Sequence, residues 1–144
     1  MKKVLKWVGG LLGAYIVFVF IFEAFFLGYF QPSFEDGGIP MLDITTKNEA
    51  GSPTTRRLAW FRSSEGNIYV SAHHWTRGWY HDLVENPDVS ADIRGVSANY
   101  TAAVVTGSEF DRVAEEYPIP FVARFLMGFP PERDIVRLDP ASGE

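Results

Sequence analysis

The chain has 144 residues and no cysteine, and this absence is the first constraint on its chemistry. Without thiols it forms no disulfides, builds no cysteine-type zinc site and uses no thiol nucleophile, although the compartment stays open. The length leaves room for one domain. Hydrophobic residues make up 47% of the chain and aromatic residues 15%. That composition suffices for a packed core, so it excludes a wholly disordered chain.

Positive charge is also scarce, and it is unevenly distributed between lysine and arginine. The formal net charge is −5, and beyond the first segment Lys47 is the only lysine. A chain without a basic stripe cannot release the counterions of a phosphate backbone, which argues against nucleic-acid binding. Arginine holds carboxylates and phosphates with a planar fork. The arginines are therefore candidates for binding an anionic ligand, with ordinary surface positions as the alternative.

The first thirty residues have the composition of a membrane anchor. Lys2, Lys3 and Lys6 precede an apolar run from Trp7 to Phe30, whose only charged residue is Glu23. As a helix this run is about 36 Å long, enough to cross a hydrocarbon core of about 30 Å. Aromatic residues stand at both of its ends, as in interfacial belts. We therefore expect a transmembrane helix over 1–30, with membrane lipid as its partner.

A cleaved signal peptide is the alternative interpretation of this run. The run is long, and the residues that end it, 22–32, offer no small-x-small cleavage site, which favours the anchor. Because the lysines precede the span and acidic residues follow it, the positive-inside rule places the amino terminus in the cytoplasm. The domain that follows then emerges on the other side, where a cytoplasmic cofactor is not at hand, so the side of the domain stays open.

The rest of the chain predicts a mainly β domain with short helices, an α+β arrangement. Residues 31–41 contain two glycines and two prolines and predict a linker, 42–140 the domain, and 141–144 a tail. Period-two segments predict six strands, at 41–46, 57–63, 67–72, 89–94, 99–106 and 134–138. Helices are expected at 79–85, at 109–117 with Ser108 as N-cap, and at 121–127. Short strands with few helices favour a small antiparallel barrel.

The histidines are the first candidates for chemistry. His73 and His74 are adjacent, so on a strand their side chains would point to opposite faces and would not share a metal easily. His81 and Asp82 offer further ligands, but no pair of histidines has the i, i+4 spacing of a helical zinc site. We therefore expect no metal site.

A serine hydrolase is also disfavoured. The chain has no G-x-S-x-G turn, and Ser71, Ser90 and Ser97 have no neighbouring residues that would activate a nucleophile.

Aromatic residues between His73 and Val89 indicate a pocket for a flat ligand. Trp75, Trp79 and Tyr80 lie near the end of a predicted strand and the start of a short predicted helix, where their rings can line a groove and stack on a planar ligand. The alternative for Trp79 is a position in the core. Four cations are candidates for holding an anionic tail of that ligand: Lys47, Arg56, Arg57 and Arg77.

The segment Trp79–Val89 reads WYHDLVENPDV, and it resembles the WYHNLxxNPxV signature of the deazaflavin-dependent nitroreductase family. The resemblance extends in order from about residue 42 to 140, through Ile44–Trp60, the strand at 67–72, the segment GSEFDRVAEEYP and the closing ERDIVRLDP. The central motif is moderately specific and the flanking segments are weaker. Proteins of this family are small split β-barrels related to the pyridoxamine-phosphate oxidase-like flavin reductases.

The resemblance implies binding of the planar, anionic cofactor F420, with FMN as the alternative, and a homodimer with cofactor sites at its interface. Lys47 matches the family's lysine, while Thr54 occupies the position of its arginine, for which Arg56 and Arg57 can substitute. The loop AHHWTRG (72–78), which carries His73, His74 and Arg77, replaces the family's glycine-rich loop. The family's asparagine is Asp82 here. These departures fall on the loop that contacts the cofactor in the family.

The function implied by the resemblance is a membrane-anchored oxidoreductase. It would transfer a hydride to a small lipophilic acceptor, quinone-like or nitro, and Tyr80 and His81 are the candidate proton donors. The cofactor carries such chemistry, and the barrel supplies a stacking wall and an anion clamp. The alternative is a non-catalytic split barrel that has lost the cofactor and serves as a binding or structural module, which the altered 72–78 loop favours.

Overall fold

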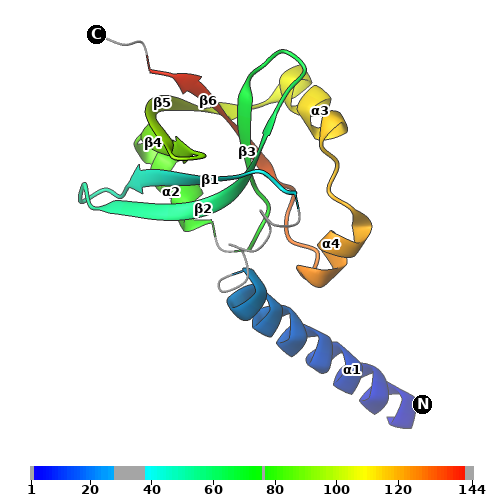
Figure 1. The fold of residues 1–144 in the computed structure, drawn as a ribbon. Helices are drawn as coiled ribbons and strands as arrows, with labels where there is room; N and C mark the ends of the chain where they lie inside the picture. The colour runs from blue at the N-terminus through cyan, green and yellow to red at the C-terminus, as the bar shows by residue number, and fades with distance from the viewer. Residues whose placement is uncertain (1, 28–37, 76, 142–144) are drawn as a thin grey trace. The chain divides into compact units, whose positions relative to one another are not determined.

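A computed structural model describes residues 2–27, 38–75 and 77–141. Six strands and four α-helices follow one another along the chain (Figure 1), with a π-helical turn, η1 (Phe22–Leu27), directly after the first helix. The helices are α1 (Lys2–Ile21), α2 (Gly78–Glu85), α3 (Gly107–Glu116) and α4 (Phe121–Leu126). The strands are β1 (Met41–Lys47), β2 (Pro53–Arg62), β3 (Ile68–Ala72), β4 (Asp88–Ile93), β5 (Val96–Val105) and β6 (Asp134–Pro140).

The six strands close into an antiparallel barrel in the order β1-β2-β3-β6-β5-β4, and β4 pairs with β1 to complete it. Three hairpins come directly from turn residues in the sequence. The clearest joins β4 to β5, where Ile93 pairs with Val96 across Arg94 (φ 57°) and Gly95 (φ 82°). Two successive positive φ angles are the geometry of the tight turns that fit the twist of a hairpin. The predicted pairing of these strands across Gly95 is confirmed.

The barrel interior is the main core. Inward positions alternate along each strand, as Leu42 and Ile44 do on β1 and Ile68, Val70 and Ala72 do on β3. Helix α2 contributes two further apolar side chains to the same cluster, so it packs against this core. The remaining buried members come from β2, α2, β4, β5 and β6: Leu58, Trp79, Leu83, Val89, Ala91, Ala102, Val136 and Leu138.

Helix α3 covers part of the outer face of the barrel through a second, smaller cluster. Val113 of α3 is buried against Tyr69, Val105 and Ile135, which belong to β3, β5 and β6. A polar network accompanies this contact at its edge. The Tyr69 hydroxyl donates to Glu109 Oε1 at 2.8 Å, and Arg137 donates to both oxygens of the same carboxylate at 2.7 and 2.9 Å. Helix α3 is thus held by apolar and ionic contacts together.

The chain divides into two compact units. The barrel and α3 belong to 33–118 and 131–144, while 1–32 and 119–130 form the other unit, which contains α1 and α4. Residues Lys2–Phe25 form one helix long and apolar enough to cross a membrane, with a mean hydropathy of 2.1 in its most apolar part. The division groups 119–130 with the N-terminal helix, whereas the sequence had placed this segment within 42–140. The domain boundaries stay a prediction, and residues 31–37 of the predicted linker 31–41 lie outside the described residues.

The predicted elements agree with the structure, with differences at their ends, such as the start of β5 at Val96 instead of at residue 99. The mainly β fold and the barrel are confirmed, and all six predicted strands and three short helices are present. Ser108 as N-cap of α3 is wrong, because the helix already begins at Gly107, after an extended Thr106. Gly107 has φ +62°, a conformation that glycine adopts without strain and that turns the chain into the helix early. Strand β2 also begins at Pro53, earlier than expected, since it pairs with β1 down to Lys47.

Candidate functional site

The loop after β3 brings the two adjacent histidines to the same place. Their ring centroids lie 4.4 Å apart with an interplanar angle of 38°. The prediction that their side chains point to opposite faces is wrong, because β3 ends at Ala72 and the histidines lie beyond the alternation of the strand. Among the residues that the structure describes, no three histidine, aspartate or glutamate side chains are grouped as a metal site requires.

Both imidazoles are neutral at physiological pH. Burial lowers the pKa of His73, and burial together with the neighbouring His73 and Arg77 lowers the pKa of His74 to about 4. The Nδ1 atom of each ring is buried and has no hydrogen-bond partner among the described residues, and the same holds for the Ser71 hydroxyl. Buried polar atoms are paired in most native structures. Three such atoms within four residues therefore mark the end of β3 as a place where a further polar group can bind.

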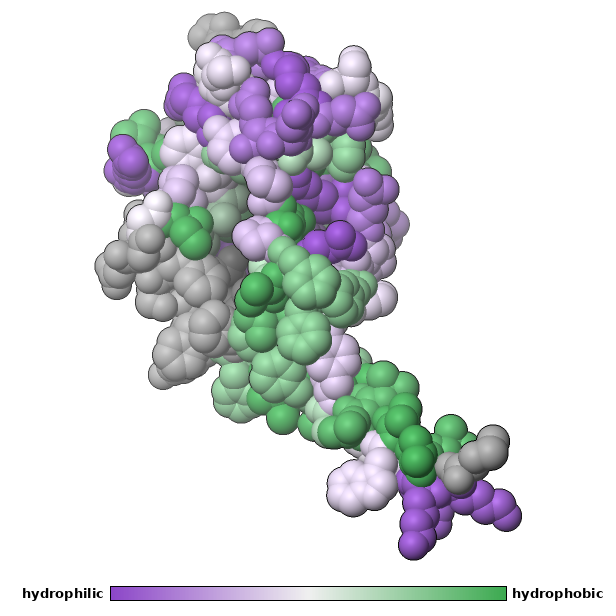
Figure 2. All heavy atoms as spheres, turned by 90° about the vertical axis from the view of Figure 1, so that its right-hand side faces the viewer, coloured by the Kyte–Doolittle hydropathy of each residue, from purple (hydrophilic) through white to green (hydrophobic). Residues whose placement is uncertain are grey.

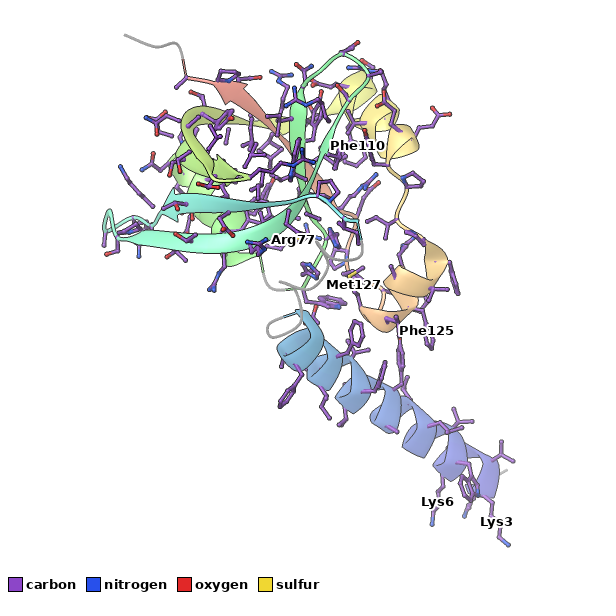
Figure 3. All side chains as sticks on the ribbon, viewed as in Figure 1. Lys3, Lys6, Arg77, Phe110, Phe125 and Met127 are labelled. Atoms are coloured by element: carbon purple, nitrogen blue, oxygen red, sulfur yellow. The ribbon has the colours of Figure 1, made fainter. Side chains whose placement is uncertain are left out.

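Arg77 joins the same loop to the start of β6 (Figure 3). Its guanidinium forms an ion pair with Asp134 and donates to the Pro131 carbonyl at 3.2 Å and the Glu132 carbonyl at 3.0 Å. Its Nε donates to the His74 carbonyl at 2.9 Å. The side chain is only 13% exposed. Arg77 therefore fastens the loop, and its donors are directed at protein acceptors instead of at solvent.

The residues of α2 lie in three different environments. Trp79 is buried in the barrel core, which is the alternative position that the sequence allowed for it. Tyr80 is partly buried beside the Asp134 carboxylate, and burial and that carboxylate raise the pKa of its hydroxyl. His81 is exposed, with its ring 5.9 Å from that of Tyr80. The rings of Trp79 and Tyr80 thus do not form one exposed stacking wall, whereas Trp75, in the preceding loop, is 54% exposed.

The other cations predicted to bind an anionic ligand lie on β1 and β2. Lys47 and Arg56 are exposed, and Arg57 forms an ion pair with Asp43 at 3.3 Å. Strand β3 pairs with β2 only over Trp60–Arg62, so in the described structure the earlier part of β2 pairs with β1 alone. Arg56 and Arg57 lie on this part. The edge of β2 on their side is therefore open at the point where the chain leaves β3 and enters the histidine loop.

A hollow near the β1–β2 turn has a different chemistry from the predicted pocket. It has a volume of about 470 Å³ and is lined by Asn48, Glu49, Glu85 and Asn86. Two carboxylates and no aromatic ring make it unsuited to a planar anionic ligand.

Two residues near the histidine loop were not anticipated from the sequence. Asp134 receives Arg77 and lies beside Tyr80, and Ser71 is a buried hydroxyl on β3. Asp134 was assigned only as the start of a strand, and no local pattern connects it with Arg77, which lies 57 residues earlier. Only the pairing of β6 with β3, where Ala72 lies opposite Asp134, brings it to this loop.

No family model matches the chain, and no curated protein is detectably similar to it in sequence. Solved structures are similar in fold. HutZ from Vibrio cholerae, described as a heme storage protein, has a TM-score of 0.50 and 17% identity, over 78% of this chain and 90% of that chain. A pyridoxamine 5'-phosphate oxidase-related, FMN-binding protein from Nostoc punctiforme has a TM-score of 0.51 and 14% identity, over 70% of each chain.

General Stress Protein 26 from Bacillus anthracis is a third similar structure, with a TM-score of 0.54 and 15% identity, over 72% of this chain and 81% of that chain. Identities this low establish the fold alone. The expectation of a split barrel is confirmed, while the nitroreductase family stays a resemblance in sequence. In its fold, the domain is a split β-barrel of the pyridoxamine 5'-phosphate oxidase-like type, and the chain carries an apolar helix near its N-terminus.

Proposed function

We propose that the protein is a membrane-anchored split-barrel oxidoreductase that binds F420, or alternatively FMN, beside the 73–77 loop. The observation that carries the proposal is the group of partnerless buried polar atoms on Ser71, His73 and His74, at the end of a barrel strand. Similar structures include proteins described as FMN-binding or as pyridoxamine 5'-phosphate oxidases. The resemblance of Trp79–Val89 to the deazaflavin-dependent family supports F420.

The histidine loop fits the polar edge of such a cofactor. A neutral imidazole has one nitrogen that donates and one that accepts, so the free Nδ1 atoms of His73 and His74 suit a ring edge carrying carbonyl and N–H groups. A buried cationic imidazolium would pair less well with such a mixed edge. Trp75, exposed in the same loop, offers a ring face for stacking.

The anionic tail of the cofactor requires cations that are not already occupied by protein carboxylates. Arg56 and Lys47 are exposed on the β1–β2 hairpin, and we assign them this role. Arg57 lies next to Arg56 on β2 and shares its charge with Asp43. We do not assign cofactor contacts to Arg77 and Trp79. Arg77 positions the loop through its hydrogen bond to the His74 carbonyl, and Trp79 is packed in the barrel core.

The cofactor would supply hydride transfer, and the chain would have to supply a proton. Tyr80 keeps its proton at physiological pH, because burial and the Asp134 carboxylate raise its pKa. The Tyr80 hydroxyl is therefore a candidate proton donor next to the loop, and the exposed His81 is the alternative proton donor. The acceptor we propose is small and lipophilic, quinone-like or nitro, since an anchored domain meets such molecules at the membrane surface.

The anchor itself is proposed as a single span with a cytoplasmic amino terminus. Lys2, Lys3 and Lys6 precede the apolar helix and support a cytoplasmic amino terminus by the positive-inside rule, while the side on which the barrel lies stays open. We also propose a homodimer, because split barrels related to the resembled family place cofactor sites between subunits. One similar structure is described as a domain-swapped dimer, with a TM-score of 0.56 and 19% identity over 69% of this chain and 80% of that chain.

The test is cofactor binding by the full-length protein in detergent micelles. F420 and FMN are titrated separately and followed by fluorescence quenching, and hemin is titrated in parallel because one similar structure is a heme storage protein. We expect one of the two redox cofactors to bind, with affinity reduced about tenfold in His74→Phe and in Arg56→Ala, the loss of about one hydrogen bond in each. Arg112→Ala, on α3, is the matched control and keeps the wild-type affinity.

The alternative function is a non-catalytic split barrel that acts as a binding or structural module. Two observations favour it: the burial of Trp79, and the use of Arg77 and Arg57 in internal ion pairs. Failure of a folded, full-length protein to bind either cofactor would establish this alternative over the oxidoreductase. Binding that persists in both His74→Phe and Arg56→Ala would instead move the site away from the 73–77 loop.

A further inference from the structure

The segment 119–130, far from the N-terminus in sequence, forms one compact unit with α1. We propose that α4 and its flanking residues enter the acyl-chain region of the bilayer beside α1, so that two segments of the protein insert into the membrane. This inference rests on the proposed membrane anchor. In this arrangement, lipid acyl chains contact the apolar face of α4.

The first observation is the exposure of apolar side chains on α4 and just after it. Phe121 is 71% exposed, Val122 65%, and Phe125 and Phe129 44% each. Phe129 contacts both of the other rings, with ring centroids 5.7 Å apart for Phe121 and Phe129, and 6.1 Å apart for Phe125 and Phe129. Contiguous exposed aromatic residues mark an interaction surface, since water disfavours them.

The second observation is that this surface continues onto the apolar helix. Figure 2 shows hydrophobic residues gathered over α4 and along α1, with hydrophilic residues at the amino-terminal end of α1. Phe125 lies on α4 near α1, and Lys3 and Lys6 project from the distant end of that helix (Figure 3). The ring of Phe125 stacks on that of Tyr15 with a centroid distance of 5.1 Å. A lipid environment for α1 therefore extends to the face of α4.

The third observation is close backbone packing between the two helical segments. Gly128 has φ +70°, and a Cβ atom added there would lie 2.6 Å from Val19 Cγ1. Val19 is the one buried residue of α1 in the described structure. Small residues that let backbones approach closely are typical of helix contacts within membranes, where packing replaces the hydrophobic effect.

The fourth observation concerns polar groups, which are costly in hydrocarbon unless they are paired. The Tyr15 hydroxyl interrupts the apolar run, and it donates to the Phe125 carbonyl at 2.7 Å. The carbonyls of Ala123 and Arg124 accept from Met127 and Phe129 at 3.0 and 2.8 Å. Pro118 and Pro131 flank the segment, Pro120 and Pro130 lie near its two ends, and none of them carries an N–H that would need a partner. The segment is thus largely self-satisfied.

The depth follows from the rise of a helix. Tyr15 lies about 14 Å beyond Lys6 along α1, and Val19 about 20 Å beyond it, at 1.5 Å per residue. In a hydrocarbon core of about 30 Å these positions lie from the middle of the bilayer to the half distant from the lysines. Arg124 is exposed in the last turn of α4, and its long stem lets the guanidinium extend toward the headgroups of that leaflet.

The absence of cysteine allows a direct test with single labelled positions in the full chain. An environment-sensitive fluorophore is attached to Val122→Cys on α4, to Val17→Cys on α1 and to Asp111→Cys on α3, all exposed side chains. Each protein is reconstituted in vesicles of phosphatidylcholine and phosphatidylglycerol. Quenching is measured with brominated acyl chains and with aqueous iodide.

We expect brominated lipid to quench the Val122 and Val17 labels at least about threefold more than the Asp111 label, as for residues within acyl chains. Iodide is expected to show the reverse order. A Val17 label quenched by lipid beside a Val122 label quenched by iodide would overturn the inference and leave the anchor intact. Iodide quenching of both labels would overturn the anchor, and the inference with it.

Discussion

The barrel and the α1–α4 unit both contain many apolar residues, but they use them in opposite ways. In the barrel, alternation places apolar side chains inside a closed sheet, and residues such as Ile44 and Val70 have no exposed surface. Among the described residues of the α1–α4 unit, most apolar side chains are exposed, whereas Val19 and Met127 are buried. The same residue types therefore stabilise the barrel by leaving water and equip the helical unit to enter lipid.

Polar contacts also differ between the barrel and the α1–α4 unit, in line with a barrel in water and a helical unit in lipid. The barrel has ion pairs that fasten its loops and its covering helix, such as Arg77 with Asp134 and Arg137 with Glu109. The helical unit is joined by a hydroxyl and a carbonyl, Tyr15 and Phe125, and by packing at Gly128. Charged pairs suit a surface in water, whereas neutral hydrogen bonds and close packing suit a membrane. Four predictions test this contrast.

The largest effect is expected from truncating a buried aromatic residue in the barrel. Trp79→Ala removes a core side chain and is expected to lower the free energy of unfolding by about 3–5 kcal/mol. Phe121→Ala truncates an exposed aromatic residue of α4, and its effect is expected to stay within about 0.5 kcal/mol. Denaturant unfolding in micelles, followed by circular dichroism, measures both. Equal effects of the two substitutions would contradict the assignment of opposite roles.

The next effect concerns the contact between α1 and α4. Gly128→Ala combines a strained positive φ with overlap on Val19, and we expect a cost of about 2–3 kcal/mol to the pairing of the two segments. Gly51→Ala is the matched control, because its φ is +75° but nothing lies within 4 Å of the added Cβ. Spin labels at exposed Leu11 and Val122 report the distance distribution. It should broaden for Gly128→Ala and stay narrow for Gly51→Ala.

A third, smaller effect tests the loop fastening. Arg77→Ala leaves Asp134 and three carbonyls without their donor, so we expect a loss of about 2 kcal/mol in the free energy of unfolding. Arg112→Ala removes an exposed ion pair with Glu65 and should leave the unfolding midpoint unchanged. Hydrogen exchange of the 73–78 amides supplies a local readout. Exchange that is no faster in Arg77→Ala would show that another contact holds the loop.

The last effect is a pH dependence that originates in the histidine pair, and it is the smallest when counted per pH unit. Burial lowers the pKa of His74 from 6.5 to about 4 in the folded protein, so the unfolded chain binds a proton first as pH falls. Stability from this group is present above pH 6.5 and is lost between 6.5 and about 4, by at most about 1.4 kcal/mol per pH unit. Unfolding of wild type and His74→Gln across this range should give a shallower slope for the variant.

Trp75→Ala serves as the control for that slope, because it changes the same loop without removing a titratable group. The same dependence in wild type and in His74→Gln would assign the titration to other residues. His73 contributes in the same direction, since burial also lowers its pKa.

Much of the fold follows from local patterns in the amino-acid sequence. Alternation predicted the strands at 67–72 and 89–94, and Gly95 predicted the turn between β4 and β5. The stop at Asn86-Pro87 predicted the end of α2 at Glu85. These features depend on neighbours within a few residues, and for that reason sequence reasoning reaches them. The apolar run likewise predicted a helix long enough to cross a membrane.

The candidate site was reached only in part. The region His73–Trp75 was singled out from the sequence, and its role as a binding site stays a prediction. Arg77 was expected to bind an anionic tail, but in the structure it forms an ion pair with Asp134. Trp79 was offered as a stacking surface and lies in the core. A residue's partners across strands depend on register and closure of the whole sheet. The spacing of residues along the chain does not determine register or closure, so the roles of Arg77 and Trp79 could not be predicted from the sequence.

The amino-acid sequence by itself determined the elements, the hairpin turns, the apolar helix and the lack of thiol chemistry, because each depends on residue type and short-range order. The tertiary structure decided three other features. It determined which face of α2 enters the core, and it left buried polar atoms of Ser71, His73 and His74 without hydrogen-bond partners among the described residues. It also grouped 119–130 with α1 in one compact unit. Each of these depends on contacts between residues distant in the chain, and such contacts exist only once the sheet closes and the helices pack.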